Sequence, residues 1–409
     1  MLREFGARLF FLPKLTAFRP SCYLRSRPMD PSPAKSRILE LDGIRGIAIL
    51  SVLCFHYISM DGAVAPGSIS ERLQRLVILG GTGVDLFFVL SGFLIGGILL
   101  DAKDSSRYFS TFYVRRFFRI FPVYYAWIAA YILAAAFGGK RLLALSHSGV
   151  APPLDFDIYN HFLFIQNCFI DRLHGLAGAW FDHTWSLAVE EQFYLVIPLL
   201  VWVLSRRALK FFLFFAVVSQ PLLRIVLFKT GWVSAGLIGQ LTFTRADVLA
   251  FGVLAALYWR DDSARNWLQK NHRWIYGTLF VLFLGFAAFW KWSPHQRALL
   301  TEAAGVSTIA MFYTALLGAV LCIPKGPIAA IARWRFLREI GTVSYCMYLI
   351  HVVVDVACHA VLLHSTPKTS SLRAAAVTLT AAFLTFAIAK MSWIILERPL
   401  LKMGHSFRY

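Results

Sequence analysis

Stretches of about 20 predominantly apolar residues recur along the whole chain, and they limit it to folds that span a lipid bilayer. Each stretch can cross the hydrocarbon core once as a helix, which satisfies its backbone hydrogen bonds without water. The sequence therefore predicts an all-α, polytopic membrane helical bundle with about ten transmembrane helices. The predicted spans are residues 44–61, 78–100, 117–137, 185–204, 211–228, 238–258, 274–291, 301–322, 340–363 and 374–396. A shorter apolar stretch, 156–169, is interpreted as interfacial or re-entrant.

The composition excludes the common soluble classes. Of the 409 residues, 58% are hydrophobic and 15% are charged, whereas a soluble domain is about 25% charged. The formal net charge is nevertheless +19, and the Lys and Arg residues lie between the apolar runs. A protein that binds nucleic acid would gather these residues on one surface. The pattern therefore favours a membrane protein with cationic loops and argues against nucleic acid as a partner.

The distribution of basic residues over the connections predicts the orientation. Alternate connections, beginning with the N-terminal segment, hold 27 Lys and Arg residues, and the remaining connections hold 10. Basic loops stay in the cytoplasm, so both termini are predicted to be cytoplasmic. Residues 1–36 are a basic cytoplasmic tail before a membrane domain at 37–409, unless translation starts at Met29 or the tail is a transit peptide. Glu397-Arg398-Pro399 is interpreted as a helix stop at the cytoplasmic face.

The first predicted span carries Arg45 and His56, eleven positions apart. At about 100° per residue the two side chains share one stripe of the helix, about 16 Å apart along its axis. Ionisable residues inside a bilayer are costly and mark functional positions. The alternative is an imidazole that only bonds a neighbouring helix.

Other ionisable residues are expected at nearly the depth of His56, on five further spans. They are Asp85, Glu190, Glu191, Arg224, Arg245, Asp247 and His351. Such a layer predicts a hydrated internal cavity that opens to the outer side. A polytopic secondary transporter would need a similar layer, although the sequence shows no repeat and no pair of interrupted helices.

Three arginines cluster at the predicted cytoplasmic end of the third span. Arg115 and Arg119 share a helix face, and Arg116 flanks them. A helix that begins here would add free N–H groups that attract anions. The cluster is interpreted either as a site for the phosphates of a nucleotide-containing cofactor or as an anchor to lipid headgroups.

Three of the histidines in the long connection at 138–184 have a spacing that fits no metal site, and contact with an acceptor or plain surface is their preferred interpretation. They are His161, His174 and His183. Trp180 and Trp185 either stack on a sugar or anchor the membrane interface.

Seven motifs follow one another between Leu41 and Leu401: LDGIRGIAILSVLCFHY, GGTGVDLFFVLSGFLI, RRFFRIFPVYY, HTWSLAVEEQFYLVIP, TFTRADVLAFG, SYCMYLIH and LERPL. Together and in this order they resemble the motifs of the membrane acyltransferase-3 family. The resemblance implies a multi-pass enzyme of the bacterial cytoplasmic membrane, which moves an acyl group, usually acetyl from acetyl-CoA, to a hydroxyl of a saccharide or glycoconjugate. Some members of the family carry a fused C-terminal hydrolase-like domain; here only about thirteen residues follow the last predicted span, so this domain is expected to be absent. No metal is expected, and the oligomeric state cannot be read from the sequence.

The resemblance also implies which positions are essential: Arg45, His56, Arg115, Arg116, Arg119 and Glu191. It is weaker at His351, which Val352-Val353-Val354 follow where relatives often have a nearby proline.

Acyl transfer from a thioester needs a base, and a histidine suits this role near neutral pH. His56 is expected either to deprotonate the acceptor hydroxyl or to be acylated first, with Asp85, Glu190 or Glu191 orienting its ring. The predicted catalytic residues are His56, Glu191 and Asp85; Arg45, Arg115, Arg116 and Arg119 are expected to bind acetyl-CoA; and Glu190, Arg245, His351 and Trp185 are expected to bind the acceptor.

Overall fold

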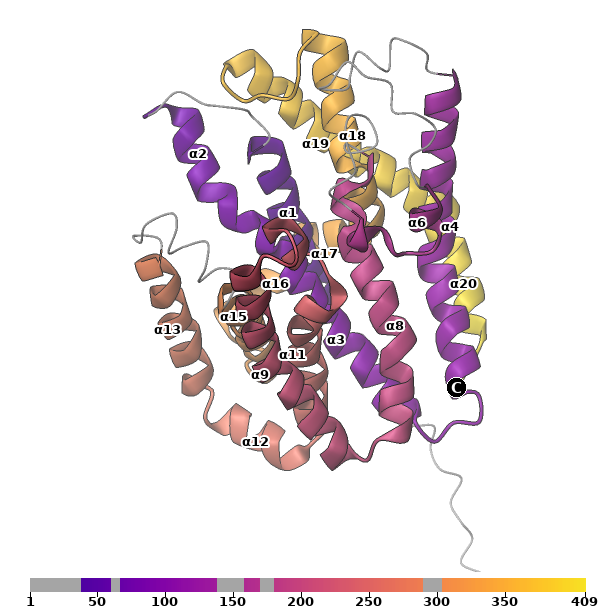
Figure 1. Cartoon of the computed structure of the whole chain (residues 1–409), viewed down its shortest axis with the longest axis vertical. Coiled ribbons are helices and arrows are strands. Elements are labelled where there is room, and N and C mark those ends of the chain that lie inside the picture. Colours follow the sequence, from indigo (N-terminus) through magenta and orange to yellow (C-terminus); the bar gives the residue numbers. More distant parts are fainter. Residues whose placement is uncertain (1–37, 60–66, 138–157, 170–179, 290–303) are drawn as a thin grey trace, which may run out of the picture. The chain divides into compact units, whose positions relative to one another are not determined.

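Helices dominate the computed structural model of the chain, which describes residues 38–59, 67–137, 158–169, 180–289 and 304–409 (Figure 1). These described residues contain no strand. The predicted basic tail, residues 1–36, lies outside them.

The N-terminal part of the bundle contains α1 (Leu39–Ser59), α2 (Ile69–Val77), η1 (Ile78–Thr82), α3 (Gly83–Ala102), α4 (Tyr108–Phe137), α6 (Ile158–Phe162), η2 (Gln166–Cys168), η4 (Asp182–Thr184), α8 (Trp185–Val203) and α9 (Arg206–Thr230). The C-terminal part contains α10 (Ala235–Ile238), α11 (Thr242–Trp259), α12 (Asp262–Lys270), α13 (Arg273–Phe289), α15 (Val306–Cys322), α16 (Pro327–Ala332), α17 (Arg335–Thr342), α18 (Ser344–Leu363), α19 (Leu372–Ser392), η6 (Trp393–Glu397) and α20 (Arg398–Ser406).

Eight of the described helical segments are long and apolar enough to cross a membrane. They coincide with eight of the ten predicted spans and confirm the helical membrane bundle. The segments at the seventh and eighth predicted spans are shorter, Arg273–Gly285 and Val306–Cys322. The short stretch at 158–169 forms only α6 and η2, which agrees with the prediction that it does not cross. The count of ten crossings and the cytoplasmic termini stay predictions.

Two glycines let α3 and α11 touch backbone to backbone. A Cβ added to Gly92 would lie 2.2 Å from the carbonyl oxygen of Leu249, and one added to Gly252 would meet the α3 backbone equally closely. Only small residues permit such an approach between membrane helices. The crossing places Asp85 on α3 beside Arg245 on α11.

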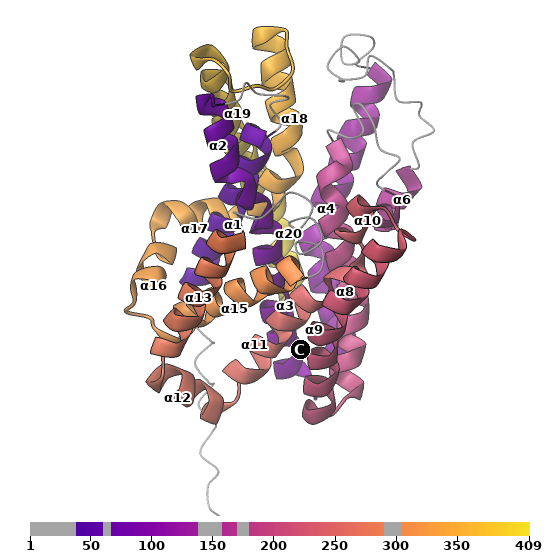
Figure 2. The same cartoon turned by 60° about the vertical axis from the view of Figure 1, so that its left-hand side comes forward.

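The helix α1 packs against α3, α17, α18 and η1, so most of its length is enclosed by protein. A Cβ added to Gly46 would lie 2.0 Å from the carbonyl oxygen of Leu337, which shows how closely α17 approaches. In turn α18 lies beside α19 (Figure 2). Arg45 and His56 thereby face other helices and not only lipid.

The last long helix continues past the predicted stop. The chain passes from α19 through the π-helical η6 into α20, which runs along α4 (Figure 1). The interpretation of Glu397-Arg398-Pro399 as a helix end was therefore wrong. Pro399 is tolerated because it follows the π turn at the start of a new α-helical register, where its missing N–H breaks no α-helical bond. The continuation buries Glu397, whose side chain is only 2% exposed.

Replacing Gly92 with Ala is expected to lower the free energy of unfolding by about 1–3 kcal/mol, because the new methyl group would overlap the Leu249 carbonyl group. Thermal unfolding of the purified protein in detergent measures this. Gly277→Ala is the matched control, since a Cβ there meets no atom within 4 Å. Equal stability of the two variants would contradict the tight crossing.

Candidate active site

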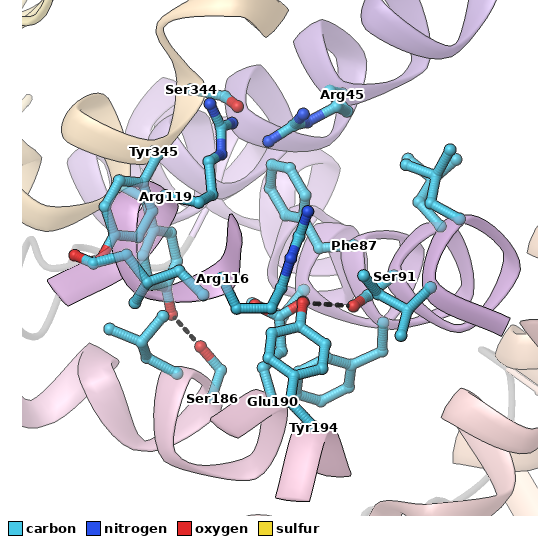
Figure 3. A pocket seen from close by; sticks show the side chains of 18 residues that line it. Arg45, Phe87, Ser91, Arg116, Arg119, Ser186, Glu190, Tyr194, Ser344 and Tyr345 are labelled. Atoms are coloured by element: carbon cyan, nitrogen blue, oxygen red, sulfur yellow. Dashed lines mark hydrogen bonds between the residues drawn. The ribbon is translucent and has the colours of Figure 1, made fainter. Parts of the chain in front are cut away.

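Five helices enclose a cavity of about 130 Å³ that three arginines line. Arg45 comes from α1, and Arg116 and Arg119 come from α4; α3, α8 and α18 complete the wall. Figure 3 shows the three guanidinium groups pointing toward one another across this space. Arg45, which the sequence places three helical turns from His56, thus lies in the same cavity as Arg116 and Arg119.

The cavity carries more positive than negative charge. Glu190 on α8 lines it and interacts electrostatically with Arg45 and Arg116. Glu397, brought inward by the π turn, interacts with Arg119 and Arg45. Three guanidinium groups therefore face two carboxylates, and like charges this close favour an anionic guest.

Tyrosine and serine hydroxyls complete the polar lining. Ser91 and Tyr194 share a hydrogen bond of 2.7 Å, and the guanidinium of Arg116 lies over the Tyr194 ring, 6.0 Å from its centroid (Figure 3). Tyr345 donates a 3.0 Å hydrogen bond to the carbonyl of Ile120 on α4. These contacts fix α4 against α8 and α18 around the arginines.

Arg115 lies apart from the other arginines. It donates hydrogen bonds of 2.9 and 2.6 Å to the carbonyl of Phe407, and its guanidinium lies 5.0 Å from the ring centroid of Tyr409. Burial raises the pKa of the Tyr409 phenol, and the nearby Arg115 and Arg116 partly offset this. The structure thus uses Arg115 to hold the chain after α20.

The arginines of α4 do not sit at a helix N-terminus. The helix begins at Tyr108, and not near residue 117 as predicted, because its first turns are too polar for a hydropathy window. Arg116 and Arg119 therefore lie in later turns, where the backbone N–H groups are already bonded within the helix. Anion attraction by free N–H groups, expected from the sequence, does not apply here.

Three histidines from separate parts of the chain form a second cluster. The rings of His56 and His351 are 4.9 Å apart between centroids, and His183 lies 5.0 Å from His351 and 6.4 Å from His56. His351 is fully buried, His183 is 5% exposed, and His56 is half-buried. The depth estimate thus placed His56 and His351 correctly in one layer.

The hydrogen bonds indicate which nitrogen of each neutral ring carries the proton. His351 Nδ1 lies 2.7 Å from the Tyr348 carbonyl, so Nδ1 donates and Nε2 is left as an acceptor. His56 Nδ1 lies 3.1 Å from both the Val52 carbonyl and His351 Nε2, so it donates to both. The remaining nitrogen, His56 Nε2, keeps its lone pair. His351 thus holds His56 in the tautomer that a base needs.

His183 belongs to this cluster, although the sequence analysis placed it in the outer connection as an acceptor contact or plain surface. Its Nε2 lies 3.2 Å from the Leu349 carbonyl, while no hydrogen-bond partner of Nδ1 is found among the described residues. The feature of the sequence that could have identified His183 is its position directly before the fourth predicted span. A span boundary two residues earlier would have included it.

Asp85 and Arg245 pair with each other. Asp85 accepts a 2.6 Å hydrogen bond from Arg245, and the Arg245 guanidinium lies 5.4 Å from the ring centroid of Trp185. The structure therefore brings Asp85, Arg245 and Trp185 together as one group. Asp85 was expected to orient the ring of His56, but it bonds the guanidinium of Arg245 instead, and His351 is the residue that hydrogen-bonds His56.

Arg224 and Asp247 form a second, fully buried pair. Two guanidinium nitrogens of Arg224 lie 3.1 and 2.9 Å from the Asp247 carboxylate oxygens, and both side chains are 0% exposed. Ser307 on α15 hydrogen-bonds both. This pair ties α9, α11 and α15 together, and we assign it to the scaffold.

Glu190 and Glu191 are neighbours in sequence but face different surroundings. Glu190 lines the arginine cavity. Glu191 is 9% exposed, and no hydrogen-bond partner of its Oε1 is found in the described part of the chain. Its electrostatic neighbours are Glu190 and Arg116, and it does not line the cavity.

Tyr348 and Ser186 separate the arginine cavity from the histidines. Both line the cavity, whereas His56, His183 and His351 do not. The Tyr348 ring lies 5.2 Å from that of His183 and 5.8 Å from that of His351. The two clusters are therefore adjacent compartments with one tyrosine between them. No group of His, Cys, Asp and Glu among the described residues is arranged to hold a metal.

A cavity lined by three arginines lies beside a cluster of three histidines. A family model described as an acyltransferase domain matches residues 38–391. The chain belongs to this acyltransferase family. Membership favours catalysis over secondary transport.

The chain is similar to bacterial proteins that are named O-acetyltransferases. It is 28% identical over 388 residues to the peptidoglycan O-acetyltransferase OatA of Listeria monocytogenes, which covers 91% of this chain and 57% of that relative. It is 28% identical to the putative peptidoglycan O-acetyltransferase YrhL of Bacillus subtilis (89% and 55%) and 26% identical to the O-acetyltransferase OatA of Staphylococcus aureus (89% and 57%). The chain thus spans little more than half the length of these relatives. No solved structure matches it significantly.

Replacing Arg224 with Leu is expected to lower the free energy of unfolding by about 3–5 kcal/mol, because the Asp247 carboxylate is left buried without a counter-charge. Thermal unfolding in detergent measures this. The double variant Arg224→Leu/Asp247→Leu is expected to recover most of the loss. A single variant as stable as the double one would contradict the assignment.

Proposed function

We propose that the chain is a membrane O-acyltransferase that moves an acetyl group from acetyl-CoA to a hydroxyl of a saccharide or glycoconjugate. The observation that carries the proposal is the pairing of compartments: an arginine-lined cavity lies against a histidine cluster, with Tyr348 between them. Family membership and the names of the relatives support acyl transfer. The cavity supports the anionic donor.

The donor is proposed to enter from the cytoplasm of the bacterial cell. The connections richer in Lys and Arg are assigned to that side, and the arginines of α4 follow one of them. Arg45, Arg116 and Arg119 would contact the negatively charged part of CoA through charge-assisted hydrogen bonds. Arg115 would act indirectly, by holding the chain after α20 against α4.

His56 is proposed as the base. Its Nε2 lone pair takes the proton of the acceptor hydroxyl, and the hydroxyl oxygen forms a bond to the acyl carbon while the carbon–sulfur bond breaks. The proton then passes from His56 to the thiolate of CoA, so the reaction balances without a further reactant. Transient acylation of His56 before the acceptor attacks would balance in the same way. His351 orients the ring in either case.

The acceptor is proposed to approach from the outer side. Arg245 and Trp185 form a pair with one charged and one aromatic face, the combination that would contact a sugar and its acidic substituents. His351 would border the reacting hydroxyl from α18, and Glu190, on the wall of the arginine cavity, would meet the acceptor only where it reaches the acyl group. Because two relatives are named for peptidoglycan, a cell-wall glycan is the first acceptor to test.

Replacing Arg116 or Arg119 with Gln is expected to weaken acetyl-CoA binding about 10- to 100-fold, since each removes a charge-assisted hydrogen bond worth about 1.5–3 kcal/mol. Isothermal titration of the purified protein in detergent with acetyl-CoA measures the affinity. Arg115→Gln, on the same helix but bound to Phe407, is expected to change it less than threefold. Equal effects of all three substitutions would point to an anchor for lipid headgroups and not to a donor site.

Replacing His56 with Gln is expected to lower kcat for acetyl transfer by about 10²- to 10⁴-fold, because the base is lost. His351→Gln is expected to give a smaller loss, because the base itself remains in place. His359→Gln, at a buried histidine two turns further along α18 that bonds Thr378, is the control and is expected to keep near-normal turnover. Transfer of radiolabelled acetyl to soluble muropeptides or chitooligosaccharides measures the rates. A fully active His56→Gln variant would refute the proposed base.

A further inference from the structure

Tyr348 stands at the boundary between the two compartments. Its side chain lines the arginine cavity, and its ring packs edge-on against His183 and tilted against His351. It is 8% exposed. Neither the family match nor the proposed chemistry gives this residue a role.

The hydroxyl of Tyr348 closes the boundary with two hydrogen bonds. It lies 2.5 Å from the carbonyl oxygen of His183 and 2.7 Å from Ser186 Oγ. A phenol has one hydrogen, and a carbonyl can only accept, so Tyr348 donates to His183 and accepts from Ser186. Figure 3 shows the bond at Ser186 on the wall of the cavity. These bonds join α18 to the start of α8 at one point.

The boundary that Tyr348 and Ser186 form would keep the acyl group of the donor away from the base. A thioester held in the cavity cannot reach His56 Nε2, because none of the three histidines lines that cavity. The tyrosine side chain must therefore move before the acyl group and the base can meet.

We propose that Tyr348 is a positioning residue that separates the donor from the histidine cluster until the acceptor arrives. This inference rests on the proposed function. In the closed state, its hydroxyl is bound to His183 and Ser186, and the thioester is kept from the base. When the acceptor occupies the histidine side, the hydroxyl leaves these partners and the acyl carbon advances to His56. Because His183 supplies both a boundary carbonyl and a ring beside His351, a ligand at the histidines can displace the bond directly.

Separating the donor from His56 would prevent hydrolysis of the donor. His56 could also activate a water molecule, which would attack the acyl carbon, break the carbon–sulfur bond and release acetate and CoA thiol. Such hydrolysis wastes the donor whenever no acceptor is bound. Exclusion of water by a residue that yields only to the proper substrate prevents it.

The test compares hydrolysis with transfer in Tyr348→Phe, which keeps the ring and loses both hydrogen bonds. The ratio of acetyl-CoA hydrolysis without acceptor to transfer with acceptor is expected to rise at least fivefold, while the affinity for acetyl-CoA changes less than twofold. Because the ratio does not depend on the amount of folded protein, a purely structural role would not move it. Release of CoA thiol and transfer of radiolabelled acetyl give the two rates.

Tyr108→Phe is the matched control. Tyr108 is buried like Tyr348, and its hydroxyl donates a 3.0 Å bond to the carbonyl of Pro198, but it does not line the cavity. Its ratio is expected to stay at the value of the unmodified protein. Ser186→Ala, which removes one of the two bonds, is expected to give a smaller rise and decides the question if Tyr348→Phe does not fold.

The outcomes separate the two proposals. If the unmodified protein neither binds nor uses acetyl-CoA, the proposed function fails and the role of Tyr348 with it. If the protein transfers acetyl normally and the ratio is unchanged in Tyr348→Phe and Ser186→Ala, only the role of Tyr348 is overturned.

Discussion

A charged group placed inside a hydrocarbon bundle needs a partner or water, and this requirement decides how the polar residues of the chain are arranged. Arg224 satisfies it with Asp247 and Ser307, and Arg245 satisfies it with Asp85. Both pairs cross between helices and hold them together. The arginines of the cavity differ, because three of them share two carboxylates. The scaffold is thus neutralised internally, while the cavity retains positive charge for a guest.

The polar groups of the histidine cluster are likewise satisfied within the protein, here by hydrogen bonds. Backbone carbonyls of Val52 and Tyr348 and the neighbouring ring fix the protons of His56 and His351, so no carboxylate is needed to orient the base. This arrangement leaves the lone pair of His56 Nε2 available. Because His56 is already bonded to His351, Asp85 is available to pair with Arg245 on α11.

The parts of the fold that could be predicted from the sequence are those that a single physical quantity determines. Hydropathy located the spans, because the cost of exposing backbone and charge to lipid dominates there, and the rise per residue placed His56 and His351 at one depth. Depth does not say which faces of which helices meet. The sequence therefore grouped Asp85 with His56, although the helix crossing at Gly92 turns Asp85 toward Arg245.

Other errors came from the ends of elements. The early turns of α4 are too polar for a hydropathy window, which misplaced its start and suggested a free N-terminus at the arginines. A span boundary that began at Trp185 left His183 in a loop. The π turn before Arg398 has no sequence signature of its own, so the inward position of Glu397 could not be foreseen.

The glycine crossing between α3 and α11 has a mechanical consequence. The two helices cannot slide past each other, because each backbone occupies the space where the other would need room for a side chain, and the Arg224–Asp247 bond fastens α9 to the same assembly. The helices α3, α9 and α11 therefore form one rigid unit. We therefore expect any widening of the cavity for the proposed donor to come from tilting of α4, α8 and α18. The contacts between these helices at the cavity are made by hydroxyl groups that can exchange partners.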